Sequence, residues 1–104
     1  METKDKEAIK HRYAAALYKA LKASHFNSYR SLALHCGIEP THMQKISTGK
    51  VDVSTTTNVA IANGLGITYT DYSAYFDMLS EVDIKEFESF IATKLNRRGK
   101  KTKS

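Results

Sequence analysis

Residues 28–67 read SYRSLALHCGIEPTHMQKISTGKVDVSTTTNVAIANGLGI and decide the fold. Ser28 can cap a helix over residues 29–36, because serine oxygens accept hydrogen bonds from the free N–H groups at a helix start. Gly37 can end that helix in the left-handed conformation that closes many helices. Pro40 then suits the first position of a second short helix, to about Thr48, since the missing proline N–H costs nothing there.

The rest of the chain also shows helical rather than strand-like periodicity. From residue 4 to residue 23, apolar residues recur at steps of three and four, which predicts a long amphipathic first helix. Ser54 or Thr55 can open a fourth helix, which Ile67 anchors at its end, and Thr68 or Thr70 can open a fifth. Asp83 is expected to open a sixth. Gly64 should weaken the fourth helix by about 1 kcal/mol relative to alanine.

This pattern predicts an all-α protein of five packed helices with a sixth helix added. We expect residues 4–80 to form the main domain, residues 81–95 to form a helix used for packing or dimerisation, and residues 96–104 to be a disordered basic tail. At 104 residues there is room for one modest core. No apolar run approaches the length of a membrane span, and METKDKEAIK lacks the hydrophobic segment of a signal peptide, so a cytoplasmic protein is expected.

Charge is distributed unevenly along the chain. Residues 1–50 hold nine Lys or Arg against four Asp or Glu, residues 51–95 hold two against seven, and residues 96–104 hold five against none. A protein that approaches phosphate with one side only has this kind of asymmetry. The alternative is that the basic tail neutralises the acidic half.

Catalytic and metal chemistry have little support in the sequence. No nucleophile with a base, no carboxylate pair and no phosphate-binding glycine loop is recognisable, so the chain is not expected to be an enzyme and no cofactor is implied. His35 and Cys36 are adjacent and point in different directions on a helix, which argues against a zinc site. A lone Cys36 also excludes an internal disulfide.

Two short helices joined by a glycine-containing turn form the unit that places its second helix in the DNA major groove. Residues 28–67 resemble the phage-repressor and Cro-like regulators, also called the XRE family. The resemblance rests on Leu32–Ala33 before the turn, Gly37 in it, Met43 and Ile46 in the second helix, Gly49–Lys50 after it, and Ala62 with Leu65 further on. It covers about residues 10–76 and implies a lambda-repressor-like domain that binds double-stranded DNA and regulates transcription.

The resemblance also implies roles for individual residues. The residues in base-contacting positions are Pro40, Thr41, His42, Gln44 and Lys45. The residues expected to contact phosphate on this basis are Tyr29, Lys22, Lys50 and Thr55. Arg97 and Arg98 lie beyond the resemblance and are added because a flexible basic tail can follow phosphates. Gln can pair with adenine, Lys can donate to guanine, and the Thr methyl can contact thymine.

Three positions depart from the family pattern. Glu39 stands where a better N-cap is common. Ser47 replaces an acidic residue that often pairs with the first helix, which would leave Lys22 free for phosphate. Val53 stands where the family often has proline, so the backbone of the loop that contains it is less restricted.

Assembly depends on the sixth helix. Its apolar stripe of Ile84, Phe87, Phe90, Ile91 and Leu95 must either cover the first and fifth helices or meet a second copy of the chain. We expect a homodimer, because one recognition helix buries little surface and such proteins usually bind two half-sites. The alternative function is a protein-interaction or antitoxin-like module that uses this helix.

Overall fold

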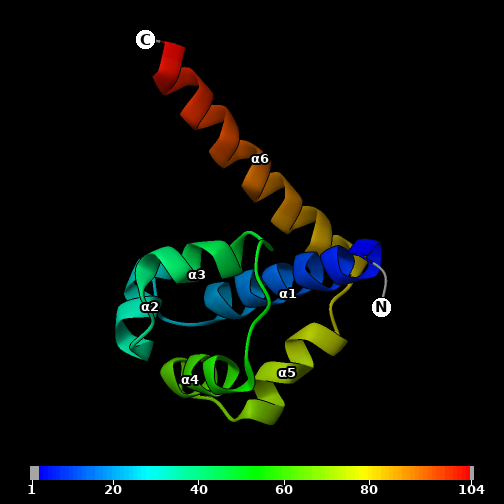
Figure 1. Ribbon diagram of the computed structural model, residues 1–104, viewed down its shortest axis with the longest axis vertical. Helices are drawn as coiled ribbons and strands as arrows, with labels where there is room; N and C mark the ends of the chain where they lie inside the picture. Colours follow the sequence, from blue (N-terminus) through cyan, green and yellow to red (C-terminus); the bar gives the residue numbers. More distant parts are fainter. Residues whose placement is uncertain (1–2, 104) are drawn as a thin grey trace.

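Six α-helices form the chain in the computed structural model, which describes residues 3–103 (Figure 1). They are α1 (Thr3–Ala23), α2 (Tyr29–Cys36), α3 (Pro40–Ser47), α4 (Thr55–Leu65), α5 (Tyr69–Asp77) and α6 (Glu81–Lys103). Within residues 3–103 there is no β-strand. The expectation of an all-helical fold is therefore confirmed.

The starts of three helices follow directly from the sequence. The side-chain oxygens of Ser28, Ser54 and Thr68 accept the backbone N–H three residues later, at 3.1, 3.2 and 3.0 Å. Each bond satisfies one of the N–H groups that a helix start leaves free. Glu39 makes no such side-chain bond at the start of α3, as its weak capping tendency predicted. Gly37 ends α2 with φ at 74°, in the left-handed region expected of it.

The start of α6 corrects one prediction. The helix begins at Glu81, and Asp83 lies in its first turn instead of preceding it. The Asp83 carboxylate accepts the N–H of Ser80 at 3.0 Å, and the Ser80 hydroxyl accepts the N–H of Asp83 at 3.1 Å. This reciprocal pair is a capping box, so Ser80 is the capping residue.

The end of α6 differs from the sequence expectation as well. The helix continues through Lys103 and extends away from the other helices (Figure 1), whereas residues 96–104 were expected to be disordered. Lys and Arg are good helix formers and no proline interrupts the segment, so the backbone can continue α6, although Gly99 weakens the helix by about 1 kcal/mol relative to alanine. Ser104 lies outside the described residues.

Helix α1 lies at the centre of the molecule and contacts α3, α5 and α6. One core cluster joins Leu17 of α1 to Leu32, Met43 and Ile61, which are all at most 1% exposed. A second cluster lies between α1 and α6, where Ala14, Ala15 and Ala16 are buried beside Phe87. These small alanine side chains allow α5 and α6 to approach the backbone of α1 closely.

Gly64 has a packing role that the sequence did not reveal. It is buried where α4 meets α2, and a Cβ atom placed on it would collide with the Sγ atom of Cys36. Burial raises the pKa of that thiol. Gly64 therefore permits the close approach of these two helices, which offsets its unfavourable helix propensity.

The apolar stripe of α6 covers α1 within the same chain. Phe87 is only 2% exposed, and its ring lies 5.4 Å from the ring of His11. Phe90 stacks on Tyr18 with ring centroids 4.6 Å apart. Ile84 and Ile91 pack against the same cluster, and Leu95 lies outside the side chains that are described. Phe87 is therefore not available for a contact with a second copy.

Arg12 fixes the turn that leads into α6. Its Nε atom donates to the carbonyl of Phe76 at 2.9 Å, and one terminal nitrogen donates to the carbonyls of Asp77 and Leu79, each at 3.3 Å. These carbonyls lie at and just beyond the end of α5, where the last oxygen atoms of a helix lack partners within it. A side chain of α1 thus caps α5 and holds the α5–α6 turn in place.

Candidate nucleic-acid interface

Helix α3 has one face in the core and the other in solvent. Met43 and Ile46 are buried in the main cluster at 0% and 1% exposure, as the sequence predicted. The solvent face carries four of the expected base-contacting residues, Thr41, His42, Gln44 and Lys45. The fifth, Pro40, is half-buried at the start of the helix.

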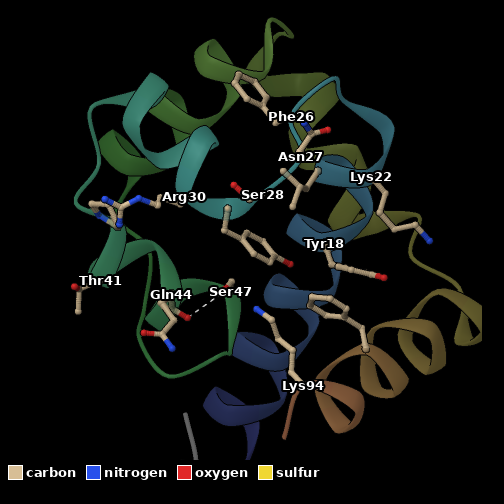
Figure 2. Close-up of a pocket in the computed structure, with 14 residues that line it drawn as sticks. Tyr18, Lys22, Phe26, Asn27, Ser28, Arg30, Thr41, Gln44, Ser47 and Lys94 are labelled. Carbon is tan, nitrogen blue, oxygen red and sulfur yellow. Dashed lines mark hydrogen bonds between the residues drawn. The ribbon is translucent and has the colours of Figure 1, made fainter. Parts of the chain in front are cut away.

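A groove of about 750 Å³ opens beside this face (Figure 2). We call it the α3–α6 groove, since α3 and α6 form its walls and α1 and the start of α2 form its floor. Its lining comprises Tyr18, Leu21, Lys22, Phe26, Asn27, Ser28, Tyr29, Arg30, Pro40, Thr41, Gln44, Ser47, Phe90 and Lys94. The groove therefore brings together three of the expected base-contacting residues and two of the expected phosphate contacts. His42 and Lys45 do not line it.

Lys94 was not identified from the sequence, and it is the main cationic group on the α6 wall. Its Nζ atom lies 5.1 Å from the centre of the Phe90 ring and 5.9 Å from that of Tyr29. Contacts of this length between an ammonium group and aromatic faces are attractive. In Figure 2 the Lys94 side chain extends from α6 toward Gln44 and Ser47.

The absence of an acidic residue at position 47 had suggested that Lys22 is free, but the structure gives it a partner. Its Nζ atom lies 3.5 Å from the carboxylate of Glu86 and 5.3 Å from the centre of the Tyr18 ring. Glu86 belongs to α6, which the resemblance did not cover. Both charged side chains are more than half exposed, so the ion pair is weak and screened by salt. Lys22 is thus a partly neutralised cation at the edge of the groove.

Tyr29 lies in the groove, but its hydroxyl is covered. The oxygen atom exposes less than 1 Å² and has no hydrogen-bond partner among the described residues. Burial raises the pKa of this phenol above its ordinary value, and the nearby Tyr18 adds to the effect, so the group stays protonated. The side chain must therefore move before this hydroxyl can contact phosphate, whereas the sequence had led us to expect an exposed hydroxyl.

The other expected phosphate contacts lie outside the groove. Lys50 is exposed just after α3, and Thr55 is exposed at the first position of α4, where Ser54 is the capping residue. Arg97 and Arg98 lie on the extending part of α6, and their side chains are outside those that the structure describes. The structure therefore distributes these cations and helix starts around α3 instead of gathering them at one point.

Comparison with protein families, with curated proteins and with solved structures found no match to this chain. None of the helices within the described residues is long and apolar enough to cross a membrane. Among the same residues, no three His, Cys, Asp or Glu side chains are grouped so as to hold a metal ion.

Proposed function

We propose that this chain is a lambda-repressor-like regulator that binds specific sequences of double-stranded DNA with α3 in the major groove. The observation that carries the proposal is the division of α3 into two faces. Met43 and Ile46 fix the helix to the core, while its solvent face presents only polar and basic side chains. A short helix anchored in this way after a glycine turn can enter a groove about 12 Å wide.

The exposed side chains of α3 suit base recognition. Gln44 can form two hydrogen bonds with adenine, and Lys45 can donate to O6 and N7 of guanine. Thr41 can contact the methyl group of thymine. Lys45 has no ion pair among the described residues, so its ammonium group has no competing partner to lose on binding.

Phosphate contacts on either side of α3 would position this helix. Lys50 lies three residues beyond the end of α3, and Thr55 opens α4, whose first N–H groups attract anions. Such contacts add affinity without adding sequence information.

Selection of binding sites from random duplexes tests the proposal. We expect the parent chain to enrich one sequence, and Gln44→Ala or Lys45→Ala to weaken binding to it by about 1 to 3 kcal/mol and relax the preference at one position. Lys85→Ala, an exposed lysine of α6, is the matched control and should leave the preference intact. Enrichment of no sequence would favour the alternative of a protein-interaction or antitoxin-like module, and neither function requires catalysis.

We further propose that the chain acts in the cytoplasm as a homodimer on paired half-sites. Phe87 packs against α1 within the chain and so is not offered as a dimer contact, and this proposal rests on the small surface that one recognition helix can bury. Sedimentation at micromolar concentration, with and without a selected duplex, tests it. The dimer would be contradicted if one chain binds a selected site that contains one half-site and no second chain joins it when the duplex contains two half-sites.

A further inference from the structure

The α3–α6 groove is strongly basic. Lys22, Arg30 and Lys94 enter its lining from three different helices. Among the described residues that line the groove, none is Asp or Glu; Glu86 is paired with Lys22 at the edge, and Glu39 is the neighbour of the lining residue Pro40 in the chain. A concave surface with cations on several sides and no lining acid attracts anions.

Two helix starts face the same groove. Ser28, Tyr29 and Arg30 bring the start of α2 into the lining, and Pro40 and Thr41 bring the start of α3. Neither helix has an acidic residue in its first turn, although the exposed Glu39 immediately precedes α3. The free N–H groups and the positive dipole ends of both helices therefore add to the field of the three cations.

The groove also has aromatic surface beside its charges. Tyr18, Tyr29 and Phe90 line it, and the Lys94 ammonium lies over the rings of Tyr29 and Phe90. These contacts limit the freedom of the long Lys94 side chain, so less entropy is lost when it binds an anion. Apolar ring surface next to a fixed cation suits a ligand that alternates anionic and apolar parts, as the phosphates and sugars of a nucleic-acid strand do.

We infer that the α3–α6 groove holds the sugar–phosphate backbone of one DNA strand and that Lys94 of α6 contacts a phosphate there. The inference rests on the proposed function. If α3 occupies the major groove, the two strands bordering that groove pass on either side of the helix. Thr41 and Gln44 belong both to the solvent face of α3 and to the wall of the α3–α6 groove, so one bordering strand lies against that wall.

The continuation of α6 favours a polymer over a small anion. From Lys94 to Lys103 the helix rises about 14 Å, which corresponds to several phosphate spacings along a strand. Arg97, Arg98, Lys100, Lys101 and Lys103 all belong to this segment. Helix α6 thus carries further basic residues beyond Lys94, and a lone phosphate ion is too small to reach them.

Replacement of Lys94 by glutamine tests the contact, with Lys85→Gln as the control on the same helix. The probe is a fluorescent mixed-sequence duplex, titrated at several salt concentrations between 50 and 200 mM. One lost phosphate contact lowers the slope of log affinity against log salt by about 0.9, so the ratio of parent to Lys94→Gln affinity should fall about 3.5-fold across this range. Lys85 is exposed and outside the groove, so its variant should keep the parent slope.

Chemical acetylation of lysines, read by mass spectrometry, gives a second measurement on the unmodified chain. The duplex should slow acetylation of Lys94 and leave that of Lys85 unchanged, whereas inorganic phosphate at matched ionic strength should protect neither. A parent slope retained in Lys94→Gln, or protection by inorganic phosphate equal to that by the duplex, would overturn the inference while leaving duplex binding by α3 in place. A parent chain that binds no duplex would overturn the proposed function and this inference together.

Discussion

Because Gly64 lies against Cys36, the effect of Gly64→Ala on the free energy of unfolding should change sign with the presence of one sulfur atom. Gly64→Ala would place a methyl group against Sγ of Cys36, so α2 and α4 must separate or the thiol must rotate. Overpacking of this kind costs about 1 to 3 kcal/mol, and the better helix propensity of alanine returns about 1 kcal/mol. We therefore expect Gly64→Ala to lower the free energy of unfolding by about 1 kcal/mol.

Cys36→Ala provides the matched background. The Cβ atom of residue 36 would then be the nearest neighbour of the new methyl group, at 3.4 Å, which is ordinary van der Waals contact. In that background Gly64→Ala should raise the free energy of unfolding by about 1 kcal/mol, because the propensity gain remains and the collision is gone. Urea unfolding of the four proteins, followed by far-ultraviolet circular dichroism, measures both differences. Stabilisation by Gly64→Ala with Cys36 present would refute the reasoning.

Three further predictions concern α6. Phe87→Ala should lower the free energy of unfolding by about 3 to 5 kcal/mol without changing the association state in sedimentation, and dissociation of a dimer that keeps its fold would contradict its burial. The hydrogen bond and ion pair from Lys19, together with the Ser80 bonds, lower the pKa of Asp83 from 3.8 to about 2. The parent should therefore be more stable than Asp83→Asn at neutral pH. Acid unfolding curves should show this difference in stability disappear as the pH falls from about 3.8 through about 2. A difference that stays constant with pH would argue against the Lys19 contact. Removal of residues 97–104 should weaken binding to any duplex at low salt and make no difference at high salt. Unchanged affinity at low salt would favour the alternative that the tail only neutralises the negative charge of residues 51–95.

Local features of the fold were predictable because local rules produce them. Ser28, Ser54 and Thr68 cap helices through bonds that span three residues, so the sequence alone placed these helix starts within one or two residues. Ile67 anchors the end of α4 as expected, with its N–H donating to the carbonyl of Ala62 at 3.1 Å. The division of α3 into a buried and an exposed face follows from the spacing of Met43 and Ile46 in the same way.

The contacts of α6 were not predictable, because they join the two ends of the chain. His11 lies 3.0 Å from Glu88, which is 77 residues further on, and nothing in either segment specifies the other as its partner. For the same reason Lys22 was expected to be free and Lys94 was overlooked. One signal was available: Phe90 and Lys94 are four residues apart and share a face of α6.

The Arg12 cap fixes the base of α6, and the packing of Phe87 and Phe90 on α1 fixes its course beyond that base. Helix α6 contains 23 residues and behaves as a rod about 34 Å long, with its base at a turn whose carbonyls Arg12 holds. A tilt of about 10° at that base would move the backbone at Lys94 by about 3.4 Å and the far end of the helix by about 6 Å. The first displacement is comparable to the length of a hydrogen bond, and the second is about twice that length. The width of the α3–α6 groove therefore depends on the α5–α6 turn that Arg12 holds, as well as on the aromatic contacts that Phe87 and Phe90 make with α1.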